Sequence, residues 1–125
     1  MIAIDTSSLV AYLSGQKGAD IDSVNFALSH DLAVFPPPVL TEILTDNKLS
    51  ASIVRFLEGV PIIHLKEGFW QRAGNSRSKL KHKGLKAKLG DTLIAQACID
   101  RDIPLITRDG DFEHFAINCG LILYP

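Results

Sequence analysis

The sequence predicts an α/β fold, a three-layer α/β/α sandwich in which helices cover both faces of a mainly parallel sheet of four to five strands. Short apolar runs alternate with segments of helical periodicity along the whole chain, which is the pattern of a parallel sheet with helical crossovers. The runs are apolar at consecutive positions, as expected for strands buried on both faces. A length of 125 residues fits a single domain, residues 1–125.

The chain opens with a predicted strand and two predicted helices. Met1–Ile4 is a short apolar run that ends at Asp5, and the hydroxyl residues after it can cap a helix through Leu13. Two glycines then interrupt the helical pattern. Residues 19–30 carry apolar side chains at helical spacing and predict the second helix.

The middle of the chain repeats the alternation of strand and helix. Leu32–Phe35 is an apolar run that three prolines end. Because proline fits the first turn of a helix, we expect Pro38 to open the next one. Ser50–Leu57 predicts another helix, which Gly59 ends, and Val60–Ile63 is a weaker strand candidate.

The C-terminal part is predicted to hold two helices and two strands. A helix is expected from Gly68 to about Lys83, and Asp91 is expected to cap another that runs through Arg101. Ile103–Thr107 and Leu121–Leu123 are apolar runs that predict the remaining strands.

Five acidic residues have related positions in this scheme. Asp5 lies just past the first strand, Asp109 and Asp111 lie just past the fourth, and Asp91 begins the helix that leads into the fourth. Glu42 is about one turn into the helix after the second strand. Because ligands bind beyond the carboxyl ends of parallel strands, these carboxylates could converge on one edge of the sheet.

Such a cluster has a definite chemistry. Carboxylates held close together raise one another's pKa, and a divalent cation removes that penalty. A set of ligands that offers only oxygen suits Mg²⁺ or Mn²⁺, which activate water for phosphodiester hydrolysis. Each acid also has an ordinary structural interpretation, as a helix cap, a turn residue or a helix glutamate, so the shared placement carries the prediction.

Four segments that contain these acids occur in a distinctive order. They are Ile4–Leu9 (Ile-Asp-Thr-Ser-Ser-Leu), Val39–Leu44 (Val-Leu-Thr-Glu-Ile-Leu), Gly90–Ala97 (Gly-Asp-Thr-Leu-Ile-Ala-Gln-Ala) and Leu105–Phe112 (Leu-Ile-Thr-Arg-Asp-Gly-Asp-Phe). In this order the sequence resembles the PIN-domain family, especially the VapC-type toxins of prokaryotic toxin–antitoxin pairs. The resemblance spans nearly the whole chain.

The resemblance implies a PIN-like sandwich and a Mg²⁺- or Mn²⁺-dependent endoribonuclease, the toxin of a type II pair. The catalytic, metal-binding residues that it carries over are Asp5, Glu42, Asp91 and Asp109, with Asp111 ranked below them as a further ligand. The hydroxyl groups that it implies for orienting the site are those of Thr6 and Thr107. It also implies an RNA substrate, a homodimer and a small antitoxin protein as partner.

Basic residues are concentrated just before the third motif. Residues 68–90, called the basic segment below, contain no Asp or Glu and hold seven of the 13 basic residues: Arg72, Arg77, Lys79, Lys81, Lys83, Lys86 and Lys88. Without acids nearby to form i,i+4 pairs, these cations are predicted to contact RNA phosphates. For Phe69 and Trp70 in the same segment, we expect burial in the core in preference to stacking on bases.

Other classes of protein find little support. Cys98 and Cys119 have no CxxC spacing and are expected to be free thiols, and the histidines lack the spacing of a zinc site. No membrane span and no secretory signal are expected, so the prediction is a cytoplasmic protein. Two alternatives remain open: a housekeeping RNA-processing nuclease, and a PIN-like binding or scaffold module without catalysis.

Overall fold

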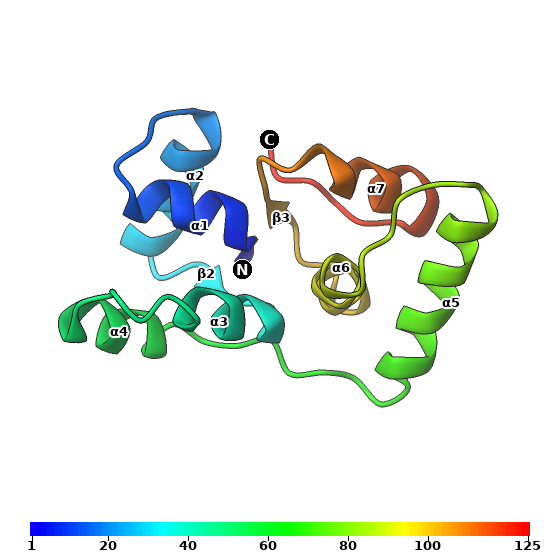
Figure 1. The fold of residues 1–125 in the computed structure, drawn as a ribbon, viewed down its shortest axis with the longest axis horizontal. Coiled ribbons are helices and arrows are strands. Elements are labelled where there is room, and N and C mark those ends of the chain that lie inside the picture. Colours follow the sequence, from blue (N-terminus) through cyan, green and yellow to red (C-terminus); the bar gives the residue numbers. More distant parts are fainter.

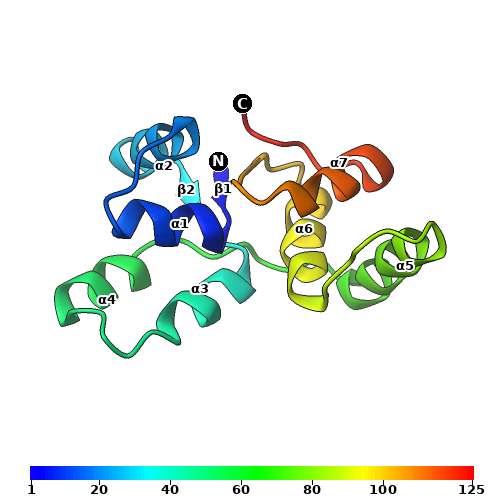
Figure 2. The same ribbon diagram turned by 45° about the horizontal axis from the view of Figure 1, so that its top comes forward.

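The computed structural model describes residues 1–125, with helices and strands alternating as the sequence predicts (Figure 1). The elements are β1 (Ile2–Ile4), α1 (Thr6–Leu13), α2 (Ala19–Ser29), β2 (Ala33–Val34), α3 (Pro37–Leu44), α4 (Ala51–Glu58), α5 (Phe69–His82), α6 (Leu89–Arg101), β3 (Leu105–Ile106), the 3₁₀ helix η1 (Gly110–Phe112) and α7 (Glu113–Cys119). In both ribbon views, α1–α4 are grouped at the left of the molecule and α5–α7 at the right, with the short sheet between them (Figures 1 and 2). The α/β sandwich is therefore confirmed.

The sheet is parallel but narrower than predicted. It has three strands in the order β2-β1-β3, with Ala3 of β1 opposite Val34 on one side and Leu105 on the other. The segments expected to form two further strands each add a single parallel bridge, Phe35 to Ile62 and Leu105 to Leu123. The prediction of four to five strands is thus corrected to three, with one bridged residue beyond each edge.

Proline accounts for part of this difference at one edge. The Phe35 amide donates to the carbonyl of Pro61 over 2.8 Å, and the Ile63 amide donates to the carbonyl of Phe35 over 2.9 Å. Pro61 has no amide hydrogen to extend the ladder. The central strands remain fully enclosed, because Ala3, Ile4 and their neighbours on the adjacent strands are buried.

Most helices begin within two residues of their predicted positions, and their first residues explain why. Ser50 caps α4 by accepting a hydrogen bond from the Ile53 amide, and α3 has prolines in its first turn. The prediction for α6 was wrong in one detail. This helix begins at Leu89, so Asp91 lies within its first turn and is not its cap. The short helix α7 was not predicted at all.

Phe69 and Trp70, the two aromatic residues of α5 that were both expected in the core, differ in their burial. Phe69, Ala73 and Leu80 are buried against the rest of the protein, whereas the Trp70 side chain is 65% exposed. Consecutive residues of a helix point about 100° apart, so Phe69 and Trp70 cannot both face inward. The prediction is confirmed for Phe69 and wrong for Trp70.

Two further expectations were tested by the structure. Cys98 and Cys119 are free thiols, and burial raises the pKa of the Cys98 thiol. None of the helices combines the length and the apolar character that a membrane crossing requires.

Candidate active site

A polar cavity of about 350 Å³ lies where β1 and β3 end. No hydrophobic side chain lines it, and the lining residues are Asp5, Thr6, Ser7, Glu42, Lys88, Gly90, Asp91 and Asp109. The structure therefore brings the four acids of the sequence motifs to one cavity, which is called the acidic cavity below. They reach it from the junction of β1 and α1, from α3, from α6 and from the segment after β3.

Asp5 is the most enclosed of these acids. It is 4% exposed, and its Oδ2 accepts hydrogen bonds from Ser7 Oγ at 2.7 Å and Thr107 Oγ1 at 2.8 Å. Burial raises the pKa of Asp5, although the hydrogen bonds from Ser7 and Thr107 oppose that effect. The carboxylate is thus fixed in position by two hydroxyl groups while its charge is only partly compensated.

Three aspartates form the tightest group beside it. Ligand oxygens of Asp91, Asp109 and Asp111 all lie within 4.8 Å of one another. Burial, followed by the negative charges of Asp109 and Asp5, raises the pKa of Asp91 to about 6, and Lys88 only partly offsets the shift. Burial and the neighbouring carboxylates therefore both disfavour the ionised form of Asp91.

Thr107 links the two halves of the acidic cavity. Its hydroxyl donates to Asp5 and also accepts a hydrogen bond from the Asp109 backbone amide at 3.0 Å. Asp109 Oδ1 in turn accepts from the Asp111 amide at 2.9 Å, which closes the turn at the start of η1. A single hydroxyl therefore sets the position of Asp5 relative to the segment that carries Asp109.

Glu42 lines the same cavity from its far side. Thr6 Oγ1 donates a 2.8 Å hydrogen bond to Glu42 Oε1, which ties the first turn of α1 to α3. Glu42 is exposed and does not belong to the close group of Asp91, Asp109 and Asp111. The structure therefore separates the predicted acids into a tight group, a buried neighbour and a more distant glutamate.

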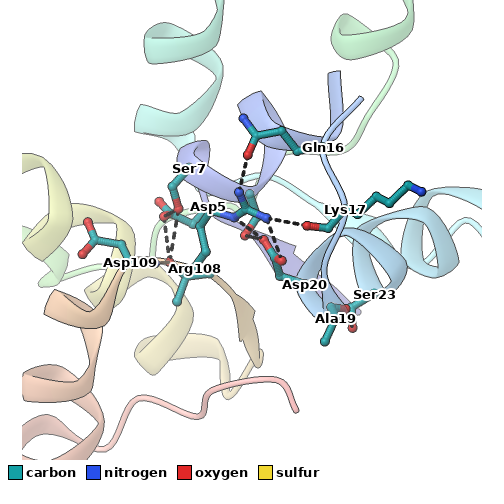
Figure 3. A network of polar contacts seen from close by, with 11 residues as sticks. Asp5, Ser7, Gln16, Lys17, Ala19, Asp20, Ser23, Arg108 and Asp109 are labelled. Atoms are coloured by element: carbon teal, nitrogen blue, oxygen red, sulfur yellow. Dashed lines mark hydrogen bonds and ion pairs between the residues drawn. The ribbon is translucent and has the colours of Figure 1, made fainter. Parts of the chain in front are cut away.

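Arg108 ties the segment between β3 and η1 to the start of α2 and to the loop between α1 and α2. Its guanidinium contacts both carboxylate oxygens of Asp20, at 2.8 and 3.0 Å, and donates to Gln16 Oε1 at 2.7 Å (Figure 3). The hydrogen bond from Arg108 is the main reason that the pKa of Asp20 falls to about 2. This network holds the backbone on either side of Arg108, including Thr107 and Asp109.

The basic segment is not one free strip of cations. Four of its side chains have partners within the protein: Arg72 with Asp100, Arg77 with the Ala87 carbonyl, and Lys79 and Lys83 with Asn118. Two others reach the acids, since Lys86 Nζ lies 3.1 Å from Asp111 Oδ2 and Lys88 lines the acidic cavity. The segment thus has both structural and site-facing members.

Two contacts at the site were not anticipated. Ser7 was predicted as a possible helix cap and as part of the first motif, without a role in the site, but its hydroxyl donates to Asp5. Lys86 was expected to face RNA, but it forms an ion pair with Asp111. The spacing of Ser7 two residues after Asp5 is a local signal, whereas the approach of Lys86 to Asp111 depends on the tertiary fold.

The donor set fits a hard divalent cation. The close group offers only carboxylate oxygens, which Mg²⁺ and Mn²⁺ prefer. Burial raises the pKa of both Asp5 and Asp91, and neighbouring carboxylates raise that of Asp91 further, so a bound cation would favour the ionised form of both. The residues present are therefore suited to hold such an ion.

A parallel α/β domain with acids gathered beyond the carboxyl ends of its strands has its polar site at the position where open α/β sheets bind ligands. The model of the PIN domain matches residues 2–118, and the chain belongs to the PIN-domain family. PIN domains are generally nucleases. Comparison with curated proteins gave no match.

Among solved structures, the chain is similar to one described as VapBC2 from Rickettsia felis bound to a DNA fragment from their promoter. The sequences are 22% identical, and the TM-score is 0.75. The match covers 99% of this chain and 98% of the other. At this identity the likeness supports the fold.

Proposed function

We propose that the protein is a Mg²⁺- or Mn²⁺-dependent endoribonuclease and the toxin of a type II toxin–antitoxin pair. The observation that carries the proposal is the convergence of Asp5, Asp91 and Asp109, distant in sequence, on one polar cavity. Membership of the PIN-domain family supports a nuclease. The VapBC2 neighbour supports a partner protein of the antitoxin kind, and the homodimer remains a prediction from the family resemblance.

Each acid has a proposed role in this reaction. Asp91, Asp109 and Asp5 would hold the divalent ion, with Asp111 beside them and Glu42 across the cavity. The bound ion supplies an activated water and stabilises charge on the phosphoryl oxygens. Thr107 and Thr6 hold Asp5 and Glu42 in position, and Lys88 offers a cation to a phosphate at the rim.

The direct test uses the purified protein with a labelled single-stranded RNA and the DNA of the same sequence. We expect internal cleavage of the RNA in Mn²⁺ or Mg²⁺, no cleavage in EDTA, and little or no cleavage of the DNA. RNA binding without cleavage in either metal would favour the non-catalytic alternative. Preference for the DNA would contradict the proposed substrate.

The biological role requires a separate measurement. Expression of the wild-type chain should arrest growth, and co-expression of a small protein encoded beside it should restore growth. Cleavage in vitro without growth arrest would instead favour the housekeeping RNA-processing nuclease.

Replacing Thr107 with valine tests the positioning of Asp5. Valine keeps the shape but removes the donor to Asp5 and the acceptor for the Asp109 amide. We expect RNA cleavage to fall by about 10- to 100-fold and Mn²⁺ affinity to fall in parallel. Calorimetry and cleavage assays measure the two effects. Thr107→Ser, which retains the hydroxyl, should recover most of both, and equal losses in the two variants would contradict the role of the hydroxyl.

Removing Arg72 tests a cation of the basic segment whose partner, Asp100, lies within the protein. Burial favours a higher pKa for Asp100, but hydrogen bonds from Arg72 and Gln96 outweigh it and hold that pKa below its usual range. We therefore expect Arg72→Ala to lower the Tm by roughly a few degrees without changing RNA affinity. Thermal melts and RNA titrations distinguish a structural cation from a substrate-binding one.

Lys88→Ala should give the opposite result. Its side chain faces the acidic cavity, so its loss should leave the Tm nearly unchanged and reduce RNA affinity. The slope of log affinity against log salt should become shallower by about 1. Lys48→Ala, an exposed lysine outside the basic segment, is the matched control. If Lys48→Ala and Lys88→Ala weaken binding equally, the contact at Lys88 is not specific.

A further inference from the structure

A second and larger cavity, of about 700 Å³, lies between α5 and α6. These helices lie side by side in both ribbon views (Figures 1 and 2). No acidic residue lines the cavity, and its lining residues are Trp70, Ala73, Gly74, Arg77, Ser78, Lys81, His82, Leu89, Thr92 and Leu93. It is called the Trp70 groove below, and the acidic site described above does not use it.

One face of α5 builds most of this groove. Trp70, Ala73, Gly74 and Arg77 follow the spacing i, i+3, i+4, i+7, so they lie along the same side of the helix. Trp70 is 65% exposed although it is a large aromatic residue. The residues one turn further on are small, which leaves open space along the helix beside Trp70.

Gly74 adds no side chain to this side of α5, and the packing of the protein does not require a glycine there. A glycine inside a helix is less favourable than alanine, and Gly74 has neither a positive φ nor a close neighbour that requires it. A Cβ atom placed there would have no heavy atom within 4 Å. The glycine therefore keeps the groove flat without serving the packing of the protein.

The chemistry of the groove changes along its length. Trp70 stands near one end of α5, and Arg77 is seven residues further, or about 10 Å along the helix axis. Lys81 and His82 follow after another turn. Arg77 donates only its Nε–H to the Ala87 carbonyl, so its Nη groups remain for a ligand. An exposed aromatic ring followed by cations, with no acid between them, is complementary to a nucleotide whose base stacks on the ring and whose phosphates meet the cations.

The Trp70 groove and the acidic cavity share a wall. Residues at the start of α6 are divided between them: Leu89 and Thr92 line the groove, whereas Lys88, Gly90 and Asp91 line the acidic cavity. A nucleic-acid strand with one phosphate in the acidic cavity can therefore pass over this turn and continue into the groove.

We propose that the Trp70 groove is a subsite for an unpaired nucleotide of the RNA substrate, close to the scissile phosphate. This assignment rests on the proposed ribonuclease function and adds a selectivity to it, because a base within a duplex is not free to stack on Trp70. A second copy of the chain is the less suitable occupant. Symmetric pairing places this face against an identical face, which carries Arg77 and Lys81 and no acid to pair with them.

Trp70 is the only tryptophan of the chain, so its fluorescence reports on the groove directly. The first experiment titrates the metal-free Asp5→Asn protein with a short single-stranded oligoribonucleotide. We expect saturable quenching of the emission. An abasic oligonucleotide of equal charge should bind without quenching, and an RNA duplex should quench much less.

Two variants test the groove without disturbing the acidic cavity. Trp70→Ala should weaken the binding of the single strand by about tenfold, measured by the anisotropy of a labelled oligonucleotide, and should raise KM for RNA cleavage more than it lowers kcat. Gly74→Leu should fill the groove, abolish quenching and weaken binding similarly while α5 stays folded. Gly74→Ala is the matched control and should bind like the parent protein.

Several outcomes would overturn this assignment. One is tight binding of the single strand by anisotropy with no quenching of Trp70, and another is unchanged affinity in both Trp70→Ala and Gly74→Leu. A third is Trp70 emission that shifts with protein concentration as a dimer forms, which would assign the groove to a second copy. Loss of the ribonuclease proposal is distinguished by the wild-type cleavage assay, since absent cleavage with intact quenching overturns the activity but not the subsite.

Discussion

Asp5→Asn is expected to reduce metal-dependent RNA cleavage by on the order of 100-fold or more, while the folded protein becomes more stable in EDTA. Asparagine still offers one oxygen to the hydroxyls of Ser7 and Thr107, so the local hydrogen bonds can persist. It removes a buried negative charge whose pKa is raised by burial. We expect the Tm in EDTA to rise by roughly 2–4 °C, measured by circular dichroism.

Measuring both RNA cleavage and Tm for Asp5→Asn distinguishes a catalytic role of Asp5 from a role in folding. Asp22→Asn removes an exposed carboxylate on α2 and serves as the matched control, with activity close to that of the wild type. Cleavage by Asp5→Asn at the wild-type rate would remove Asp5 from the proposed site. Loss of cleavage together with a lower Tm would indicate that Asp5 supports the fold instead.

The parts of the site that could be predicted from sequence are those that local chain direction determines. Asp5 and Asp109 each follow an apolar run, and the carboxyl ends of parallel strands meet at one edge of the sheet. Their arrival at one cavity follows from that rule. The same reasoning placed Glu42 one turn into α3, but could not show that it lies apart from the tight group.

The parts that were missed depend on contacts between distant segments. Arg72 looks like a substrate-binding cation in sequence, and only the packing of α5 on α6 brings it to Asp100, 28 residues further along the chain. The orientation of Trp70 was missed for a related reason. The periodicity of α5 is weak because polar residues and Gly74 interrupt it, so the sequence did not decide which aromatic residue faces the core.

The number of strands in the sheet could not be predicted from the periodicity of the sequence either. Val60–Ile63 is as apolar as a short strand, yet Pro61 limits its pairing to a single bridge at Phe35. The helix Glu113–Cys119 follows the site-bearing turn directly and buries Phe115, but it is too short for its periodicity to be distinctive.

The stability of the metal-free protein is expected to fall as the pH rises from about 4 to about 6. The pKa of Asp91 is about 6 in the folded protein against an ordinary value of 3.8, so the folded state binds this proton more tightly than the unfolded state. The stabilisation from that proton is complete at low pH and disappears as the pH passes 6. Asp5, whose pKa is also raised, acts in the same direction.

An acid with a lowered pKa makes the protein less stable at low pH. Asp20 has a pKa of about 2, so its ion pair with Arg108 stabilises the protein above pH 4 and is lost as the pH falls towards 2. Maximum stability in EDTA is therefore expected near pH 4–5, below the usual range. For Asp91 the loss on going to pH 7 should be about 1 kcal/mol, after allowance for solvent screening. Urea unfolding across this pH range measures the profile.

Saturating Mn²⁺ should reverse the pH dependence of stability above pH 5, so that stability rises with pH. The reason is that the ion competes with protons for the same carboxylates. At about 100 times its Kd, an ion that binds only the folded state adds about 2.7 kcal/mol. Asp91→Asn supplies the decisive comparison. It should be more stable than the wild type at pH 7 in EDTA and less stable in Mn²⁺, so the order of the two proteins reverses with metal. If Asp91→Asn is less stable than the wild type under both conditions, the Asp91 carboxylate supports the fold. It would then not be a group that both destabilises the metal-free protein and binds the ion.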